Sequence, residues 1–328
     1  MIKLIPSDLN VDFLKISKPF VIASTVGVIL SLVALVKPGL KYGIDFTGGA
    51  EVQVKVPSAW DIGKVRQVME VGNIKDPVVV QVGEPGRNEY LVKVQAAPDQ
   101  LKRLSEQVDG ILIQNAGIGN YEIKKTDVVG PQAGSNLKKS ALLSILYAAI
   151  GIVTYIALRF DFRFAPGILR ALLFDMILTV GVWILLGKEF NLTILAALLT
   201  IAGYSCNDTI VIYDRIRDFT KSHPNWELEK IVNRSINLNL GRTVLTVLCT
   251  LFVVVSLWLL GGSILGDFAL CMLIGFAISI FSTIFVANTL VVYMEKRRLK
   301  GQRGHQARYS PGTSKNILKT RVSPGFGK

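Results

Sequence analysis

The sequence predicts an α-helical membrane protein with six transmembrane helices and one external α+β domain between the first and second helix. Six apolar runs are separated by shorter polar segments, and one polar stretch, residues 41–137, is long enough to bury its own core. Half of the residues are hydrophobic and 19% are charged, whereas soluble domains carry roughly 25% charged residues. Pattern and composition therefore both favour a membrane protein.

The first apolar run covers residues 20–36 and follows a long polar lead-in. A secretory signal and an uncleaved transmembrane helix are the two interpretations of such a run. This run is longer than a usual signal core and no small-x-small cleavage site follows it, so we interpret it as an uncleaved helix. Lys15 and Lys18 before the run place its start on the cytoplasmic side.

The polar stretch at residues 41–137 carries both structural periods. Val52, Val54 and Val56 alternate as in a strand, and residues 58–72 have the period of an amphipathic helix. The next expected elements are strands at 78–82 and 91–94, a helix at 98–108, a short candidate strand at 111–113 and a strand at 121–129. The main order, β-α-β-β-α-β, is that of a ferredoxin-like domain.

Five further apolar runs follow, at residues 140–158, 165–187, 192–213, 243–260 and 267–293. Six spans put both termini on one side of the membrane. Basic residues concentrate in the segments 159–163 and 214–242 and in the tail, whereas Lys188 is the one basic residue in the two short turns of the other face. Because basic residues in short loops mark the cytoplasmic side, we expect both termini there.

These observations divide the chain, whose net charge is +13, into five expected parts. They are a cytoplasmic N-terminus at 1–18, a transmembrane helix at 19–37, a periplasmic ferredoxin-like domain at 38–138, a five-helix transmembrane domain at 139–295 and a basic, disordered cytoplasmic tail at 296–328. The tail could bind anionic lipid headgroups or a ribosome-like partner, or could serve only as a topology signal. We expect no nucleic-acid partner.

The most informative stretch is the run at 192–213, which polar residues interrupt between positions 203 and 209. Asp208 lies six residues before Asp214, so the helical rise places it roughly 9 Å inside that end of the span. A charge at such a depth is costly, and an intramembrane carboxyl is therefore a functional-site hypothesis by default. Asp208 is the first candidate site residue.

Other polar residues could join Asp208. Asp175 lies inside the third span, roughly 13 Å from its cytoplasmic end, and could face Asp208 from the neighbouring helix. Arg242 stands at the start of the fifth span, where its side chain can either snorkel to the surface or fold toward Asp208. Three residues are candidate supporting groups: Asn207, Thr243 and Thr246.

These residue types suit ion transport. Burial favours the protonated form of a carboxyl and a nearby arginine favours the ionised form, so a carboxyl between the two can bind a proton on one side and release it on the other. Sodium is the alternative ion, and a purely structural pair of Asp208 with Arg242 is the alternative to transport. The three cysteines lie in apolar runs without CxxC spacing or histidine partners, so we expect no metal and no cofactor.

Six stretches of sequence resemble those of one family of membrane proteins. They are YGIDFTGG at 42–49, VGPQAG at 129–134, RFAPGILRALLFD at 163–175, GYSCNDTIVIYDRIR at 203–217, SINLNLGRTVLT at 235–246 and the Gly-Gly turn at 261–262. In this order the chain resembles the SecD/SecF family of protein-export membrane proteins, in the resistance–nodulation–division superfamily. Phe174 and Gly241 depart from the pattern, which often has His and Ser at these positions.

The resemblance implies an accessory, non-enzymatic subunit of the Sec protein-export machinery in the bacterial cytoplasmic membrane. Such subunits use the proton-motive force to promote late-stage preprotein translocation. The implied partners are SecD on a separate chain, the SecYEG channel, YajC, the lipid bilayer and unfolded preprotein, which the external domain would hold. The residues that match the family's proton-transport positions are Asp208 and Arg242.

Two other functions are alternatives to proton-driven export. A structural stabiliser of the channel complex would need no ion transport of its own. Half of a small-molecule exporter from the same superfamily is the other alternative, although that class has larger external domains and an apolar drug pocket. Substitution of Asp208 discriminates the first alternative, because a stabiliser would lose complex assembly and not activity.

Overall fold

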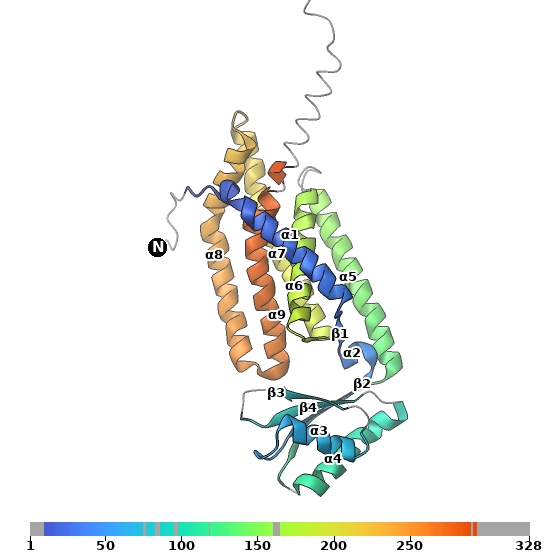
Figure 1. Cartoon of the computed structure of the whole chain (residues 1–328). Coiled ribbons are helices and arrows are strands. Elements are labelled where there is room, and N and C mark those ends of the chain that lie inside the picture. The colour runs from blue at the N-terminus through green and yellow to red at the C-terminus, as the bar shows by residue number, and fades with distance from the viewer. Residues whose placement is uncertain are drawn as a thin grey trace, which may run out of the picture.

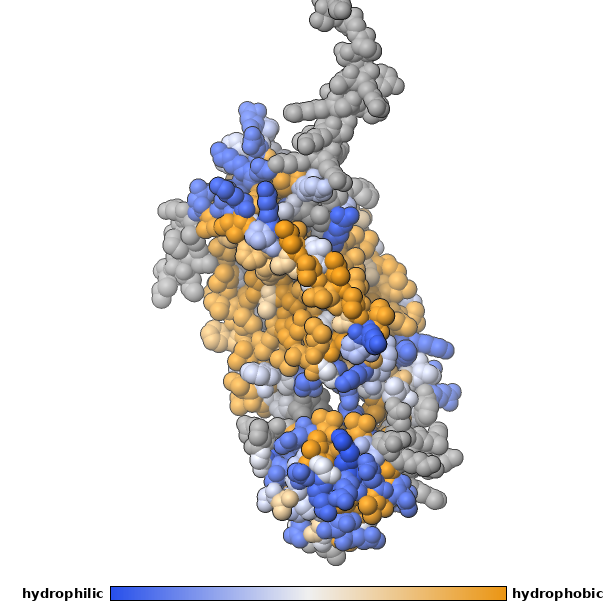
Figure 2. Space-filling model, viewed as in Figure 1, coloured by the Kyte–Doolittle hydropathy of each residue, from blue (hydrophilic) through white to orange (hydrophobic). Residues whose placement is uncertain are grey.

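The computed structural model describes residues 10–74, 77–82, 86–94, 98–117, 119–159, 165–289 and 291–293. It consists of a bundle of long helices with a small sheet domain at one end (Figure 1). On the face seen in Figure 2, apolar side chains form a broad band over the bundle, and hydrophilic side chains gather beyond both of its ends. The predicted tail lies outside the described residues.

Six helices of the described chain are long and apolar enough to cross a membrane, which confirms the predicted number of spans. The helices are α1 (Phe13–Val36), α5 (Pro131–Arg159), α6 (Ala165–Leu185), α7 (Leu192–Ser222), α8 (Leu228–Leu260) and α9 (Gly262–Phe281), which continues as the π-helix η1 (Ser282–Ala287). The helix α1 crosses the bundle diagonally and packs against α6 and η1 (Figure 1).

The helices extend beyond the apolar runs. The segment 214–242, expected as a loop, is largely a helical hairpin, because α7 continues to Ser222 and α8 begins at Leu228. Ile216 and Ile231 are buried there in a shared core, and Trp226 packs against it. This packing outside the bilayer-length run supports helix where hydropathy alone does not.

The N-terminal segment is fixed to this hairpin by two asparagines of α8. The Asn237 side chain accepts a hydrogen bond from the Val11 N–H at 3.0 Å and donates one to the Val11 carbonyl oxygen at 2.9 Å. Asn233 accepts a bond from the Phe13 N–H at 2.9 Å. Helix α1 therefore begins at a fixed position on α8.

The external domain has the predicted ferredoxin-like order. Its elements are β2 (Gly49–Lys55), α3 (Ile62–Val71), β3 (Val78–Val82), β4 (Glu89–Val94), α4 (Pro98–Ala116) and β5 (Glu122–Val129). The sheet order is β3-β4-β2-β5 with antiparallel pairing throughout. Helices α3 and α4 cover the face of the sheet that points away from the bundle (Figure 1).

The short candidate strand at 111–113 was wrong. These residues belong to the C-terminal part of α4, which runs to Ala116 instead of ending at 108. Ile111 and Leu112 are buried in the core that α3 and α4 form with the sheet. A short apolar run has no period of its own, so its pattern did not distinguish a strand from the end of a buried helix.

Short elements join the external domain to the bundle. The strands β1 (Lys41–Tyr42) and β6 (Glu189–Phe190) pair in parallel beside the four-residue helix α2 (Ile44–Thr47). The backbone of Gly49, which begins β2, has a φ of +146°, and a Cβ there would lie 2.8 Å from the Val94 carbonyl oxygen. Glycine at this position therefore allows the chain to pass directly from the junction into the sheet.

Candidate functional site

Helix α7 carries Asp208 into the interior of the bundle without a break. The polar interruption at 203–209 does not end the helix, which is continuous over Leu192–Ser222. Asp208 is 9% exposed, and Ser205 and Thr209 beside it are also buried. Asn207 is exposed on this isolated chain, because successive residues of a helix point in directions about 100° apart. The structure therefore places Asp208 inside and Asn207 outside.

Arg242 on α8 is the charged residue that acts electrostatically on Asp208. Its side chain is exposed, and among the described residues no ion pair within 4.0 Å joins it to Asp208. The two residues thus influence each other across the α7–α8 contact without a closed salt bridge. A carboxyl in this arrangement is less firmly held in its ionised form than one in direct contact with a guanidinium.

The two threonines after Arg242 lie differently. Thr243 is buried, at 4% exposure. Thr246 is exposed, and its hydroxyl donates to the backbone carbonyl oxygens of Arg242 and Thr243, both at 3.0 Å. Thr246 therefore uses its hydroxyl on its own helix, as threonines in membrane helices often do.

Asp175 on α6 is more deeply buried than Asp208, with no exposed surface. Its Oδ2 accepts a hydrogen bond from the Ser205 hydroxyl of α7, and its Oδ1 has no hydrogen-bond partner. The Thr179 hydroxyl donates to the Asp175 backbone carbonyl oxygen at 2.7 Å. The structure thus joins Asp175 to the residue one helical turn before Asp208, although it gives no direct contact between the two carboxyls.

The last span adds polar residues that the sequence analysis did not select. The π-helix η1 buries Ser282 and Thr283, and Ser282 faces the Asp175 carboxyl. The Thr283 hydroxyl lies 3.3 Å from that of Thr209. Asn288 donates to the Thr283 carbonyl oxygen at 2.6 Å. The interruption of the last apolar run by these residues was a signal for this cluster, but the π-helix that turns them inward leaves no sequence pattern.

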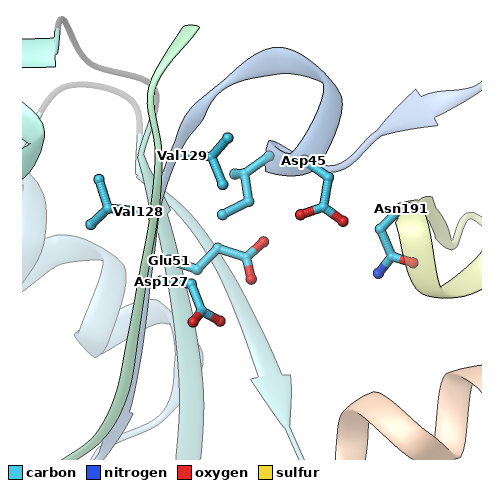
Figure 3. A pocket seen from close by; sticks show the side chains of 7 residues that line it. Asp45, Glu51, Asp127, Val128, Val129 and Asn191 are labelled. Carbon is cyan, nitrogen blue, oxygen red and sulfur yellow. The ribbon is translucent and has the colours of Figure 1, made fainter. Parts of the chain in front are cut away.

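A second polar site lies where the external domain meets the bundle. A cavity of about 330 Å³ lies there. Its lining includes Asp45 of α2, Glu51 of β2, Asp127 of β5 and Asn191, the residue before α7 (Figure 3). Asp45 accepts a hydrogen bond from the Leu192 N–H at 2.9 Å, and Asn191 caps α7 by accepting one from the Ile194 N–H at 2.9 Å. The junction is therefore bonded to the first turn of the helix that carries Asp208.

A charged bridge reinforces this junction. Lys93 of β4 forms ion pairs with Glu51, at 3.0 Å, and with Glu189 of β6. Burial raises the pKa of Glu51 above its ordinary value, and Lys93 opposes this shift. Burial works against the charge on Lys93, yet its bonds to Glu189 and Glu51 raise the pKa of Lys93. The bridge links the external sheet to the bundle through one lysine.

No group of three or more His, Cys, Asp or Glu side chains suited to a metal occurs in the part of the chain that the structure describes. Cys206 and Cys271 are buried free cysteines, and Cys249 is an exposed one. The chemistry that these residues can carry is therefore that of carboxyl and hydroxyl oxygens with a single arginine nearby. Such a set can bind and release a small cation.

Comparison with known proteins identifies the family. Residues 111–297 match the family model "Protein export membrane protein SecD/SecF, C-terminal", and residues 33–56 match the model "SecD/SecF GG Motif". The chain is 39% identical over 302 residues to the protein translocase subunit SecF of Calditerrivibrio nitroreducens, covering 90% of this chain and 98% of that protein. It is 41% identical over 287 residues to the SecF of Magnetococcus marinus, covering 87% and 92% of the two chains.

A solved structure shares the fold. The chain superposes on SecDF from Thermus thermophilus, described as a translocon-associated membrane protein, with a TM-score of 0.80 and 32% identity. The match covers 88% of this chain and 39% of that one, so this chain spans about two fifths of the SecDF chain. A SecDF structure in a super-membrane-facing form gives a TM-score of 0.67 at 33% identity, covering 91% and 40%. The chain therefore belongs to the SecD/SecF family of protein-export membrane proteins.

Proposed function

We propose that the chain is the SecF-type subunit that works with a separate SecD subunit to couple the proton-motive force to late-stage preprotein translocation. Asp208 carries the transported ion, and Arg242 adjusts its affinity. The names of the curated relatives support a translocase subunit. The length and name of the SecDF relative support a SecD partner. SecYEG, YajC and the unfolded preprotein complete the proposed assembly.

One observation carries the proposal: Asp208 is a buried carboxyl in a membrane-spanning helix, with an arginine close enough to act on it but no closed ion pair. A carboxylate that served only to hold helices together would gain most from a direct, hydrogen-bonded ion pair. An open pair instead lets the carboxyl take up and release a cation as α7 and α8 move relative to each other.

The proposed orientation puts the sheet domain outside the cytoplasm and the α7–α8 hairpin inside it. Arg215 and Arg217 near the end of α7 and Arg234 in α8 support this assignment, because basic residues are retained on the cytoplasmic side. The sheet domain lies at the other end of the bundle (Figure 1). In the proposed orientation it meets a polypeptide that leaves the channel, and the bonds between its junction and α7 support a route by which ion binding would move it.

The test is preprotein translocation into vesicles that contain this chain, a SecD subunit and the channel, measured with and without a proton gradient. Asp208→Asn keeps the shape of the side chain and removes its charge. We expect translocation by this variant in the presence of a proton gradient to fall to the level that is measured without a gradient. Proton flux through the complex should fall with it. Asp218→Asn is the matched control, since Asp218 is an exposed acid on the same helix, and it should retain the wild-type response.

Assembly must be measured in the same vesicles. If Asp208→Asn is recovered with SecD and the channel in wild-type amounts and still responds fully to the gradient, the proposal is wrong. If the variant instead lowers recovery of the complex in proportion to its activity, the structural-stabiliser alternative holds. Replacing the proton gradient with a sodium gradient tells the two candidate ions apart.

A further inference from the structure

We propose that Asp175 forms a second ion-binding site in this chain, for a proton or a sodium ion, together with the hydroxyls of Ser205 and Ser282. The site lies between α6, α7 and the last span. It deepens the ion coupling proposed above and rests on it. The two carboxyls are distinct sites in the proposal, because Asp175 bonds to Ser205, one helical turn before Asp208, and no contact among the described residues joins the carboxyls to each other.

The first support is the state of the carboxyl itself. Asp175 has no exposed surface, and one of its two oxygens has no hydrogen-bond partner. Among the described residues, the side chains that act on the Asp175 carboxyl are the uncharged hydroxyls of Ser205 and Ser282. A buried carboxylate without a counter-charge is very unfavourable. A bound cation or proton on the free oxygen removes that cost.

The second support is the chemistry around the carboxyl. The helices that meet at Asp175 bury further hydroxyls, those of Thr179 in α6, Ser205 in α7, Ser279 in α9 and Ser282 in η1. Hydroxyl and carbonyl oxygens are therefore the ligands that these helices offer. Hard cations prefer oxygen ligands of this kind. One carboxylate matches the charge of one monovalent cation, and the described residues hold no cluster of acids that would favour a divalent metal.

The third support is the irregular backbone of the last span. The π-helix η1 begins at Ser282, the residue that faces Asp175. Short π-helical turns within membrane helices widen the helix and often mark functional sites. Asn288, just after η1, is 1% exposed, and its Oδ1 has no hydrogen-bond partner. The last span therefore carries a buried, unpartnered oxygen of its own.

Buried hydroxyl groups of α7 and η1 also link the regions of the two carboxyls in the proposal. Ser205 and Asp208 are three residues apart on α7, so their side chains lie on the same side of the helix. Thr209 and Thr283 approach each other across the same interface, at 3.3 Å between hydroxyl oxygens. Hydroxyls can both donate and accept hydrogen bonds. Ser205 is therefore bonded to Asp175 and lies one helical turn from Asp208, which makes its hydroxyl the proposed link between the two carboxyls.

The experiment measures occupancy at Asp175 directly. Vesicles that contain the full chain and SecD are treated with dicyclohexylcarbodiimide, which reacts with protonated carboxyls in apolar surroundings, and modification of the Asp175 peptide is quantified by mass spectrometry. For a sodium site, adding Na⁺ in place of K⁺ at constant pH should protect Asp175. For a proton site, only raising the pH should protect it. If Asp175 is not modified, or if neither Na⁺ nor pH changes its modification, the proposal is overturned.

A matched pair of serine variants separates ion binding from packing. Ser205→Ala removes a hydrogen bond to the ionised carboxyl and should shift the protection curve by about tenfold in ion concentration. Ser256→Ala is the control, because the exposed Ser256 hydroxyl bonds only to the Phe252 carbonyl oxygen of its own helix. An unshifted curve in Ser205→Ala would contradict the proposed ligand set.

The same labelling in the Asp208→Asn background distinguishes this inference from the proposed function. Ion-dependent modification of Asp175 in that background supports the site, whatever the effect of Asp208→Asn on export. In the opposite outcome, labelling of Asp175 in the wild-type chain does not depend on Na⁺ or pH, while Asp208→Asn still reduces export. That result would rule out the Asp175 site and leave the proposed function standing.

Discussion

The partly buried acids of the external domain and its junction are paired with lysines, whereas the acids buried inside the membrane bundle are not. At the junction, Glu51 and Glu189 share Lys93, and in the sheet Glu89 is bonded to Lys124 and Gln53. Inside the bundle, Arg242 acts on Asp208 without a closed ion pair, and the side-chain groups that act on Asp175 are hydroxyls. A carboxylate in an ion pair with a lysine helps to fix the position of a domain. A buried carboxylate without a closed ion pair can instead bind a mobile cation. The difference agrees with the proposed roles, in which ion pairs hold the junction and the bundle binds the transported ion.

Asp208→Asn and Asp175→Asn give the largest expected contrast between function and stability. Each substitution should abolish the response to an ion at its site, yet the unfolding temperature of the purified chain at neutral pH should stay the same or rise. The physical reason is that the amide removes a buried charge that has no close counter-charge. Thermal unfolding in detergent checks this, and a marked fall in the unfolding temperature of both variants would show that these acids are structural after all.

The sequence predicted the parts of this contrast that depend on local pattern. The apolar runs located all six spans, and the alternation of valines with amphipathic helices gave the ferredoxin-like order. Asp208 stood out because a single acid interrupts an apolar run. Asp175 was selected in the same way, from its place inside the third apolar run, and its depth in the membrane stays a prediction.

Long-range pairing could not be predicted in the same way. Lys93 and Glu189 are 96 residues apart, and the lysine is one of many in a polar domain. The bond between Ser205 and Asp175 depends on how α6 and α7 are rotated against each other, which apolar runs of similar composition do not specify. Asn207 beside Asp208 was a candidate supporting group, but the helical step turns it to the exposed side.

Lys93→Ala tests the paired half of the comparison. It should lower the free energy of unfolding by about 2 kcal/mol, between the values for exposed and fully buried pairs, because it leaves Glu51 and Glu189 close together without a cation. Lys125→Ala is the matched control, since Lys125 pairs with Asp127 and both side chains are more than two fifths exposed. That control should change stability by no more than about 0.5 kcal/mol.

Both lysine variants are assayed by thermal unfolding and by protease sensitivity of the junction. Cleavage near β1 and β6 should increase in Lys93→Ala, because the bridge between the external sheet and the bundle is lost. Equal behaviour of Lys93→Ala and Lys125→Ala would mean that the ion pairs at the junction do not fix the external domain.

Glu89→Gln gives the smallest expected effect and depends on pH. The hydrogen bond from Lys124 lowers the pKa of Glu89 below its ordinary value of 4.5. The stabilisation is therefore present above pH 4.5 and is lost as the pH falls through the lower pKa of the folded state. The variant should be less stable than the wild type at neutral pH by about 1 kcal/mol or less, and the difference should shrink on acidification. An unfolding temperature measured from neutral pH downward checks this, and a constant difference across the series would show that Glu89 is not held by its charge.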